Sequence, residues 1–165
     1  MRILGVTFLV YLLLLGCAST GTSPEMGDMA PDFKITDVSG KQVILSDFRG
    51  EKNVVLIFYE SHLWAACMEQ LGELQEQISE IKKLDGEVIA FSIRDTKPWV
   101  KGTKYSLKIT YTMIPTPNRA IAKKYGFRPG GEGMIIIDKK GRIRYKNINL
   151  GHSSSSLIIR ELKGI

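Results

Sequence analysis

The sequence predicts an α/β domain in which helices cover both faces of a mixed central sheet. The apolar run 53–59 (NVVLIFY) has the length and the β-branched and aromatic content of a strand that is buried on both faces. From Ala65 onward, leucines and isoleucines recur at helical spacing through 71–81, which predicts an amphipathic helix of about 18 residues. A second apolar run at 87–93 completes a strand–helix–strand unit. Such a unit implies a parallel strand pair with a right-handed crossover.

Shorter elements flank this unit. The patterns predict strands near 34–37 and 42–45 with a turn at Gly40, a helix capped by Thr116 with Pro117 at its first position and a stop at Gly126, strands at 134–138 and 142–148, and a terminal helix after Ser153–Ser156. Residues 95–114 allow either a short helix or a loop, because Gly102 weakens a helix there. Helices on both sides of a mixed sheet are the thioredoxin-like layout, and the pattern alone is also compatible with other α/β folds.

Length and charge narrow the function classes. The chain has 165 residues, enough for one domain with a full-sized core. It carries 23 Lys and Arg against 17 Asp and Glu, and we interpret the net charge of +6 as spread along the chain in short lysine pairs. No basic block is interleaved with aromatic residues, so nucleic-acid binding is not expected. The positive net charge does predict a mild attraction to an anionic membrane surface.

Residues 1–16 have the pattern of an export signal. Arg2 precedes the apolar run 3–15, which is long enough for a signal peptide and short for a membrane span. The ending LLGC, with Gly16 before Cys17, resembles the lipobox of bacterial lipoproteins. This resemblance implies cleavage before Cys17 and a lipid on its thiol. The protein would then be anchored in the cell envelope with its domain extracytoplasmic, or periplasmic where an outer membrane is present. An uncleaved anchor with an unmodified Cys17 is the alternative.

The expected organisation has three parts. Residues 1–16 form the signal peptide, residues 17–28 a lipidated flexible tether, and residues 29–165 the globular domain. With Cys17 modified, Cys67 is the only free thiol of the processed chain, so no intramolecular disulfide is expected. Two histidines and one free cysteine do not predict a preformed metal site, and no cofactor is expected.

Five segments in order resemble landmarks of the peroxiredoxin (AhpC/TSA, redoxin-like) family, over about residues 29–150. They are APDF (30–33), GKQVILSDFRGEKNVVLIFY (40–59), CMEQLGELQ (67–75), PTPNRAIAKKYGF (115–127) and IIIDKKGRIRY (135–145). The resemblance implies a thioredoxin-like fold and the reduction of hydroperoxides by a cysteine that becomes a sulfenic acid. Counted from Phe58 and Tyr59, Cys67 matches the family's reactive cysteine. It would lie at a helix start, where free N–H groups lower the pKa of a thiol.

Three positions near Cys67 differ from the family's pattern, which is Pro-x-x-x-Thr-x-x-Cys. Glu60 stands at the Pro position and Trp64 at the Thr position. Glu132 stands where the family's activating Arg is expected, and a nearby carboxylate raises the pKa of a thiol. We expect Glu60 to admit water and add negative charge. Trp64 would either cap a substrate pocket or pack on the helix.

Other side chains are candidates to line the site. Arg128 lies four residues before Glu132. Arg94 and Arg119 are further cations that would reach Cys67 if the fold brings them close to it. His62 lies in the loop before the cysteine. A solvated loop histidine is the expectation there, with a base toward the thiol and a metal ligand as alternatives.

The sequence therefore predicts a membrane-anchored thiol oxidoreductase that reduces hydroperoxides through Cys67. An external thiol would regenerate the cysteine. The alternative hypothesis is a catalytically silent thioredoxin-fold lipoprotein that acts as an interaction or stress-sensing module. An ordinary dithiol reductase is not expected, because the nucleophile of a Cys-x-x-Cys pair would fall on Trp64.

Overall fold

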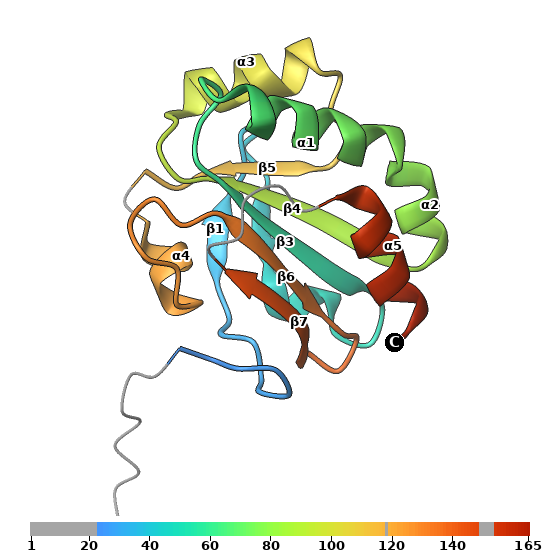
Figure 1. Ribbon diagram of the computed structural model, residues 1–165. Helices are drawn as coiled ribbons and strands as arrows, with labels where there is room; N and C mark the ends of the chain where they lie inside the picture. Colours follow the sequence, from blue (N-terminus) through green and yellow to red (C-terminus); the bar gives the residue numbers. More distant parts are fainter. Residues whose placement is uncertain (1–22, 118, 149–153) are drawn as a thin grey trace, which may run out of the picture.

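The computed structural model describes residues 23–117, 119–148 and 154–165, and it has the predicted thioredoxin-like α/β fold (Figure 1). The main sheet has the strand order β5-β4-β3-β6-β7. Its strands are β3 (Asn53–Tyr59), β4 (Gly86–Ser92), β5 (Thr112–Pro115), β6 (Gly133–Ile137) and β7 (Ile143–Ile148). β3 and β4 are parallel, as are β4 and β5, whereas β6 runs antiparallel to both β3 and β7. The predicted strand–helix–strand unit is confirmed.

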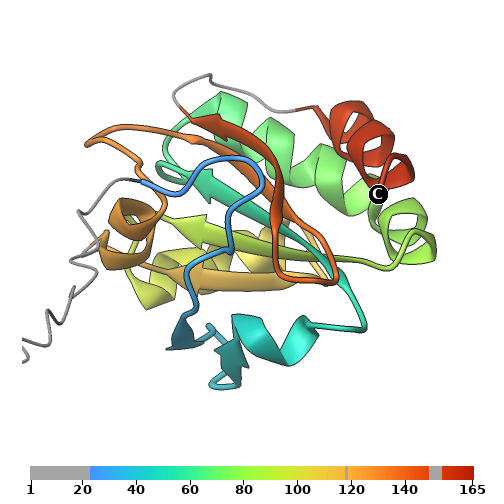
Figure 2. The ribbon, with the colours of Figure 1, turned by 90° about the horizontal axis from the view of Figure 1, so that it is seen from below.

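Helices cover both faces of this sheet. They are α1 (Ala65–Glu76), α2 (Ile78–Lys83), α3 (Lys97–Ser106), α4 (Ala120–Lys124) and α5 (Ser155–Lys163), with a 3-10 turn η1 (Leu45–Phe48) and the hairpin β1 (Lys34–Thr36) and β2 (Gln42–Ile44). α1, α2 and α5 lie on one face, while α4, η1 and the hairpin lie on the other (Figure 2). α3 lies beyond the β5 edge, at the top of Figure 1.

β3 contributes to both hydrophobic cores because its side chains alternate between the two faces. Val55 and Ile57 pack with Leu71 beneath α1. Phe58 stacks on Phe91 on the opposite face, with 4.9 Å between ring centroids. Every residue of β3 is buried. The strand therefore ends at a fixed point on the carboxyl edge of the sheet, where the loop toward Cys67 begins.

The long predicted helix is interrupted. Gln77, with φ −94° and ψ 3°, separates α1 from α2, and its N–H bonds to the carbonyls of Glu73 and Gln75. The apolar spacing continues across the break, because Ile78 and Ile81 are both buried. Sequence periodicity alone therefore does not reveal it.

The prediction that Thr116 caps a helix is wrong. Its hydroxyl donates to the carbonyl of Ser92 at 2.9 Å, and its N–H donates to the same oxygen at 2.8 Å. Thr116 thus extends the pairing of β5 with β4, and α4 starts later, after Arg119 in a left-handed conformation (φ 57°). A helix does form within 95–114: α3 tolerates Gly102 at an exposed position. Strand β5, which follows α3, was not predicted.

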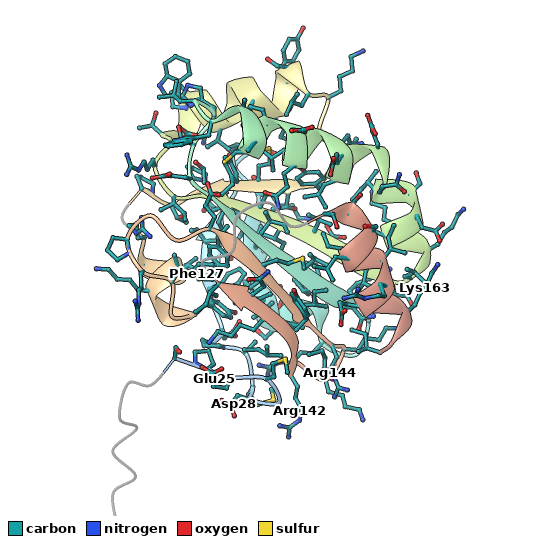
Figure 3. All side chains as sticks on the ribbon, in the orientation of Figure 1. Glu25, Asp28, Phe127, Arg142, Arg144 and Lys163 are labelled. Carbon is teal, nitrogen blue, oxygen red and sulfur yellow. The ribbon has the colours of Figure 1, made fainter. Side chains whose placement is uncertain are left out.

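The chain enters the domain along β7. The N–H of Gly27 donates to the carbonyl of Ile143 at 2.8 Å, and the N–H of Ile143 donates to the backbone carbonyl of Asp28 at 2.9 Å. Asp28 and Arg142 lie at the same end of the molecule in Figure 3. These bonds tie the last residues of the expected tether to the domain. Cys17 and the expected signal peptide lie outside the described residues, and no described helix is long and apolar enough to span a bilayer.

Candidate functional site

Cys67 lies in the first turn of α1, eight residues after the end of β3. Trp64 is the N-cap residue, and its carbonyl accepts the N–H of Cys67 at 3.0 Å. No side chain caps this helix start, and no acidic residue lies in the first turn. The Cys67 residue is only 3% exposed. The thiol is therefore buried at the N-terminus of a helix whose first turn is not stabilised by a capping side chain.

Glu132 contacts the thiol directly. The Sγ of Cys67 donates to Oε1 of Glu132 at 3.1 Å, and the same oxygen accepts the N–H of Glu60 at 3.1 Å. Burial and this carboxylate raise the pKa of Cys67 from 9.0 to about 11, against the lowering effect of the backbone N–H groups of Ser61 and Glu60. The structure thus places a carboxylate beside the sulfur, where the resemblance implies an arginine.

Glu60 does not open the site to water. Its carboxylate is 12% exposed and pairs with Arg94, with 2.7 Å between Oε1 and Nε. The Arg94 side chain is 64% exposed, so this ion pair lies at the surface. Arg94 thereby offsets the charge of Glu60 and does not contact the thiol. The expected extra negative charge from Glu60 is largely cancelled.

Asp95 holds the loop that leads to Cys67. Its carboxylate accepts the Ser61 hydroxyl at 2.8 Å and the His62 N–H at 2.8 Å, and it lies 2.7 Å from His62 Nδ1. Asp95 is 4% exposed; burial raises its pKa, but the hydrogen bonds from His62, Ser61 and Ser92 outweigh burial and leave the pKa below its usual value. An ionised Asp95 therefore fixes both side chains.

His62 is not a solvated loop histidine, and that expectation is wrong. Its ring is bonded to Asp95 and stacks on the indole of Trp99, with 4.4 Å between centroids and an interplanar angle of 11°. Sequence reasoning missed Asp95. Its position three residues after the end of β4 was the available signal, because parallel strands bring their carboxyl ends to one edge of the sheet.

The remaining candidates do not contact the sulfur. Arg128 is exposed, and its carbonyl accepts an N–H from the Arg119 guanidinium at 2.5 Å. The residue Trp64 is 56% exposed and so is not packed into the core. Within the described structure, the thiol of Cys67 hydrogen-bonds only to Glu132 among side chains. The described residues contain no group of three or more His, Cys, Asp or Glu side chains arranged to hold a metal ion.

Comparison with known proteins adds family information to this geometry. The model of the AhpC/TSA family matches residues 26–146. The chain is 30% identical to 2-Cys peroxiredoxin BAS1, chloroplastic, of Spinacia oleracea over 140 residues, and the match covers 76% of this chain and 53% of that protein. It is 32% identical to Peroxiredoxin-1 of Gekko japonicus over 139 residues, and the match covers 75% of this chain and 69% of that protein. The chain therefore spans about half the length of the chloroplastic relative.

A solved structure shows the same fold. Peroxidoxin BcpB from Mycobacterium tuberculosis superposes with a TM-score of 0.75 at 17% sequence identity, covering 86% of this chain and 98% of that one. At this identity the superposition bears on the fold alone.

Proposed function

The chain belongs to the AhpC/TSA family, and from that premise we propose that it reduces hydroperoxides through Cys67. The Sγ of Cys67 attacks the terminal oxygen of the hydroperoxide. An S–O bond forms as the O–O bond breaks, and the leaving alkoxide takes up a proton to become an alcohol. Cys67 is oxidised to a sulfenic acid while the hydroperoxide is reduced.

The position of Cys67 carries this proposal. The thiol lies in the first turn of α1 directly after β3, and the backbone N–H groups of Ser61 and Glu60 favour its ionised form. Cys67 is the only free cysteine among the described residues. Regeneration therefore draws on an external thiol: the first thiol displaces water to form a mixed disulfide, and a second thiol releases Cys67.

We expect the reaction to be slow at neutral pH. With a pKa of about 11, a fraction of roughly 10⁻⁴ of the thiol is ionised at pH 7. Access is also limited, because the residue is 3% exposed. The first turn of α1 has no side-chain cap, so local opening there costs less than opening elsewhere in the helix.

The Glu132 contact favours a second candidate function. The thiol of Cys67 donates its hydrogen to a carboxylate oxygen 3.1 Å away, which keeps the sulfur neutral. A buried, neutral thiol fills space in a core as a small side chain does. The domain would then be a catalytically silent interaction or stress-sensing module. The two candidates differ in one measurable quantity, the rate at which Cys67 forms a sulfenic acid.

The test treats the full chain with hydrogen peroxide and a sulfenic-acid trap, beside a Cys67→Ser variant. Both proteins carry Cys17→Ser so that only one thiol is followed. Trapping that depends on Cys67 and exceeds the rate of a free thiol of the same pKa supports the peroxidase. A rate equal to or below that reference favours the silent module.

We further propose that Cys17 carries a lipid that anchors the domain on the extracytoplasmic side of a membrane. The support is the sequence: the apolar run 3–15 followed by Gly16 and Cys17. A Cys17→Ala variant should lose metabolic labelling with a fatty-acid analogue while the wild type retains it. Persistent labelling of the variant would rule out this anchor.

A further inference from the structure

The net positive charge of the chain comes from one segment. Residues 96–131 contain eight of the 23 Lys and Arg and no Asp or Glu. The rest of the chain has 15 basic residues against all 17 acidic ones, a small negative balance. The expectation that the excess is spread along the chain is therefore wrong. The expectation that no basic stretch is interleaved with aromatic residues is wrong as well, because Trp99 and Tyr105 lie among the lysines of this segment. This basic segment contains α3, the edge strand β5 and α4.

α3 and the turn that follows it present this charge to solvent together with exposed aromatic rings. Lys97, Lys101 and Lys108 are exposed, and within the described structure none of them forms an ion pair. Trp99 is 59% exposed and Tyr105 is 86% exposed. These five residues are called the α3 surface below. Exposed Trp and Tyr beside unpaired cations are typical of binding surfaces, because they supply apolar contact area within a charged rim.

The α3 surface is continuous with the loop that precedes Cys67. Trp99 stacks on His62, and the next two residues of that loop, Leu63 and Trp64, are 80% and 56% exposed. A partner seated on α3 would therefore also contact the loop over the thiol. One acidic charge of the loop, that of Glu60, is already offset by its ion pair with Arg94.

The position of α3 argues against the anchoring membrane as its partner. α3 lies at the end of the molecule opposite residues 23–28, where the chain enters the domain (Figures 1 and 3). Five residues lie between Cys17 and Ser23, so this stretch of chain spans at most about 20 Å. A lipid on Cys17 therefore holds the entry end near the bilayer and turns α3 away from it.

We propose that the α3 surface docks an acidic protein thiol that reduces oxidised Cys67. This inference rests on the peroxidase function proposed above and names the class of its reductant. The partner's thiol attacks the sulfenic sulfur, an S–S bond forms as the S–O bond breaks, and the oxygen leaves as water. A second thiol of the partner then attacks its own sulfur in the mixed disulfide, so the partner becomes a disulfide and Cys67 returns to the thiol.

The first experiment measures docking without chemistry. Trp64 and Trp99 are the only tryptophans of the chain, so their fluorescence reports directly on this region. The full chain is titrated with the peptide Glu-Glu-Leu-Ser-Leu-Glu-Glu and with its counterpart in which every Glu is Lys. We expect the acidic peptide to bind about tenfold or more tightly, and the difference to disappear near 1 M salt.

Two variants locate the effect. Replacing Lys97, Lys101 and Lys108 by Gln removes three charges from the α3 surface and should abolish the preference for the acidic peptide. A matched control replaces Lys82, Lys83 and Lys163, which are exposed lysines of α2 and α5, and removes the same charge elsewhere. The control should keep the preference. An equal loss in both variants would mean that net charge alone acts, and it would overturn the docking surface.

The second experiment measures reduction. The same peptides with Cys in place of Ser react with Cys67 that has already been converted to its sulfenic acid, and mixed-disulfide formation is followed by mass. Rates are corrected for the thiol pKa of each peptide. We expect the acidic thiol to react about tenfold faster than the basic one, and the charge-neutralised α3 variant to lose this ratio.

The outcomes separate this inference from the function on which it rests. Absence of a trapped sulfenic acid overturns the peroxidase, and the Ser-peptide titration still decides whether α3 docks acidic partners. Formation of the sulfenic acid with equal rates for both thiol peptides overturns the reductant proposal. Fluorescence that responds to vesicles of anionic phospholipid and not to the acidic peptide would assign the α3 surface to a membrane instead.

Discussion

Replacing Glu132 by Gln should make Cys67 more reactive. The substitution keeps the size of the side chain and removes its charge. In the wild type, the Sγ hydrogen is donated to a carboxylate oxygen 3.1 Å away, which stabilises the neutral thiol. A glutamine at this position offers an N–H that stabilises the thiolate instead. The backbone N–H groups of Glu60 and Ser61, which favour the thiolate, remain in place.

The size of the effect follows from the causes of the pKa shift. Burial is the largest cause of the rise to about 11 and is unchanged by the substitution. The hydrogen bond and charge of Glu132 are smaller causes, so we expect the pKa to fall by about one unit. The thiolate fraction at pH 7 would rise about tenfold. Each thiolate becomes less nucleophilic as its pKa falls, so the net gain in rate is about threefold.

The assay is alkylation by iodoacetamide in the Cys17→Ser background, followed by mass across pH 6 to 11. Iodoacetamide probes ionisation without requiring peroxidase activity, so the result does not depend on the proposed function. Glu73→Gln on α1 serves as a matched control for the loss of one carboxylate. If Glu132→Gln leaves the rate and the midpoint of the pH profile unchanged, the carboxylate does not control this thiol and the reasoning from the 3.1 Å contact is refuted.

Four further predictions concern the fold around the site and the thiol itself. Asp95→Asn should lower the free energy of unfolding by about 1–3 kcal/mol, because three hydrogen bonds to the loop lose a charged acceptor; urea denaturation measures this, and an unchanged midpoint would contradict it. Gly133→Ala should lower the free energy of unfolding by about 3 kcal/mol or more, because the added Cβ would lie 2.1 Å from the carbonyl oxygen of Asn147. Gly102→Ala has open space around it and should raise the free energy of unfolding by about 0.5–1 kcal/mol. Urea denaturation of both variants measures the two effects. Alkylation of wild-type Cys67 should rise about tenfold per pH unit from pH 7 to pH 10, because the thiol ionises only near pH 11; a plateau near pH 8 would exclude the raised pKa.

The fold was largely predictable because apolar spacing records which faces are buried. The run 53–59 became β3 with its predicted bounds, since a strand buried on both faces leaves an uninterrupted apolar signal. Short strands at the edge of the sheet leave a weaker apolar signal. β5 has four residues, of which only two are fully buried. Thr116 is a residue type that often caps helices, but here its hydroxyl donates to a carbonyl of the sheet. Such choices depend on tertiary partners that local sequence does not contain.

The site was predictable where chain position fixes it. The structure places Glu132 beside Cys67 because β6 pairs with β3 in a fixed register, with Gly133 opposite Phe58. Counting along the sequence therefore led to the correct contact. The role of His62 was not predictable in this way, because its partners Asp95 and Trp99 come from another strand end and from α3.

Ionisation of Cys67 is coupled to the stability of the site around it. The pKa in the folded protein is about 11, against an ordinary value of 9.0, so folding favours the neutral thiol. That contribution, about 3 kcal/mol, is fully present below pH 9 and is lost as the pH rises from 9 to 11. A thiolate beside Glu132 thus weakens the packing that buries it, at a helix start without a side-chain cap. The charge that makes the sulfur nucleophilic also favours the opening that exposes it, so reaction and access should increase together.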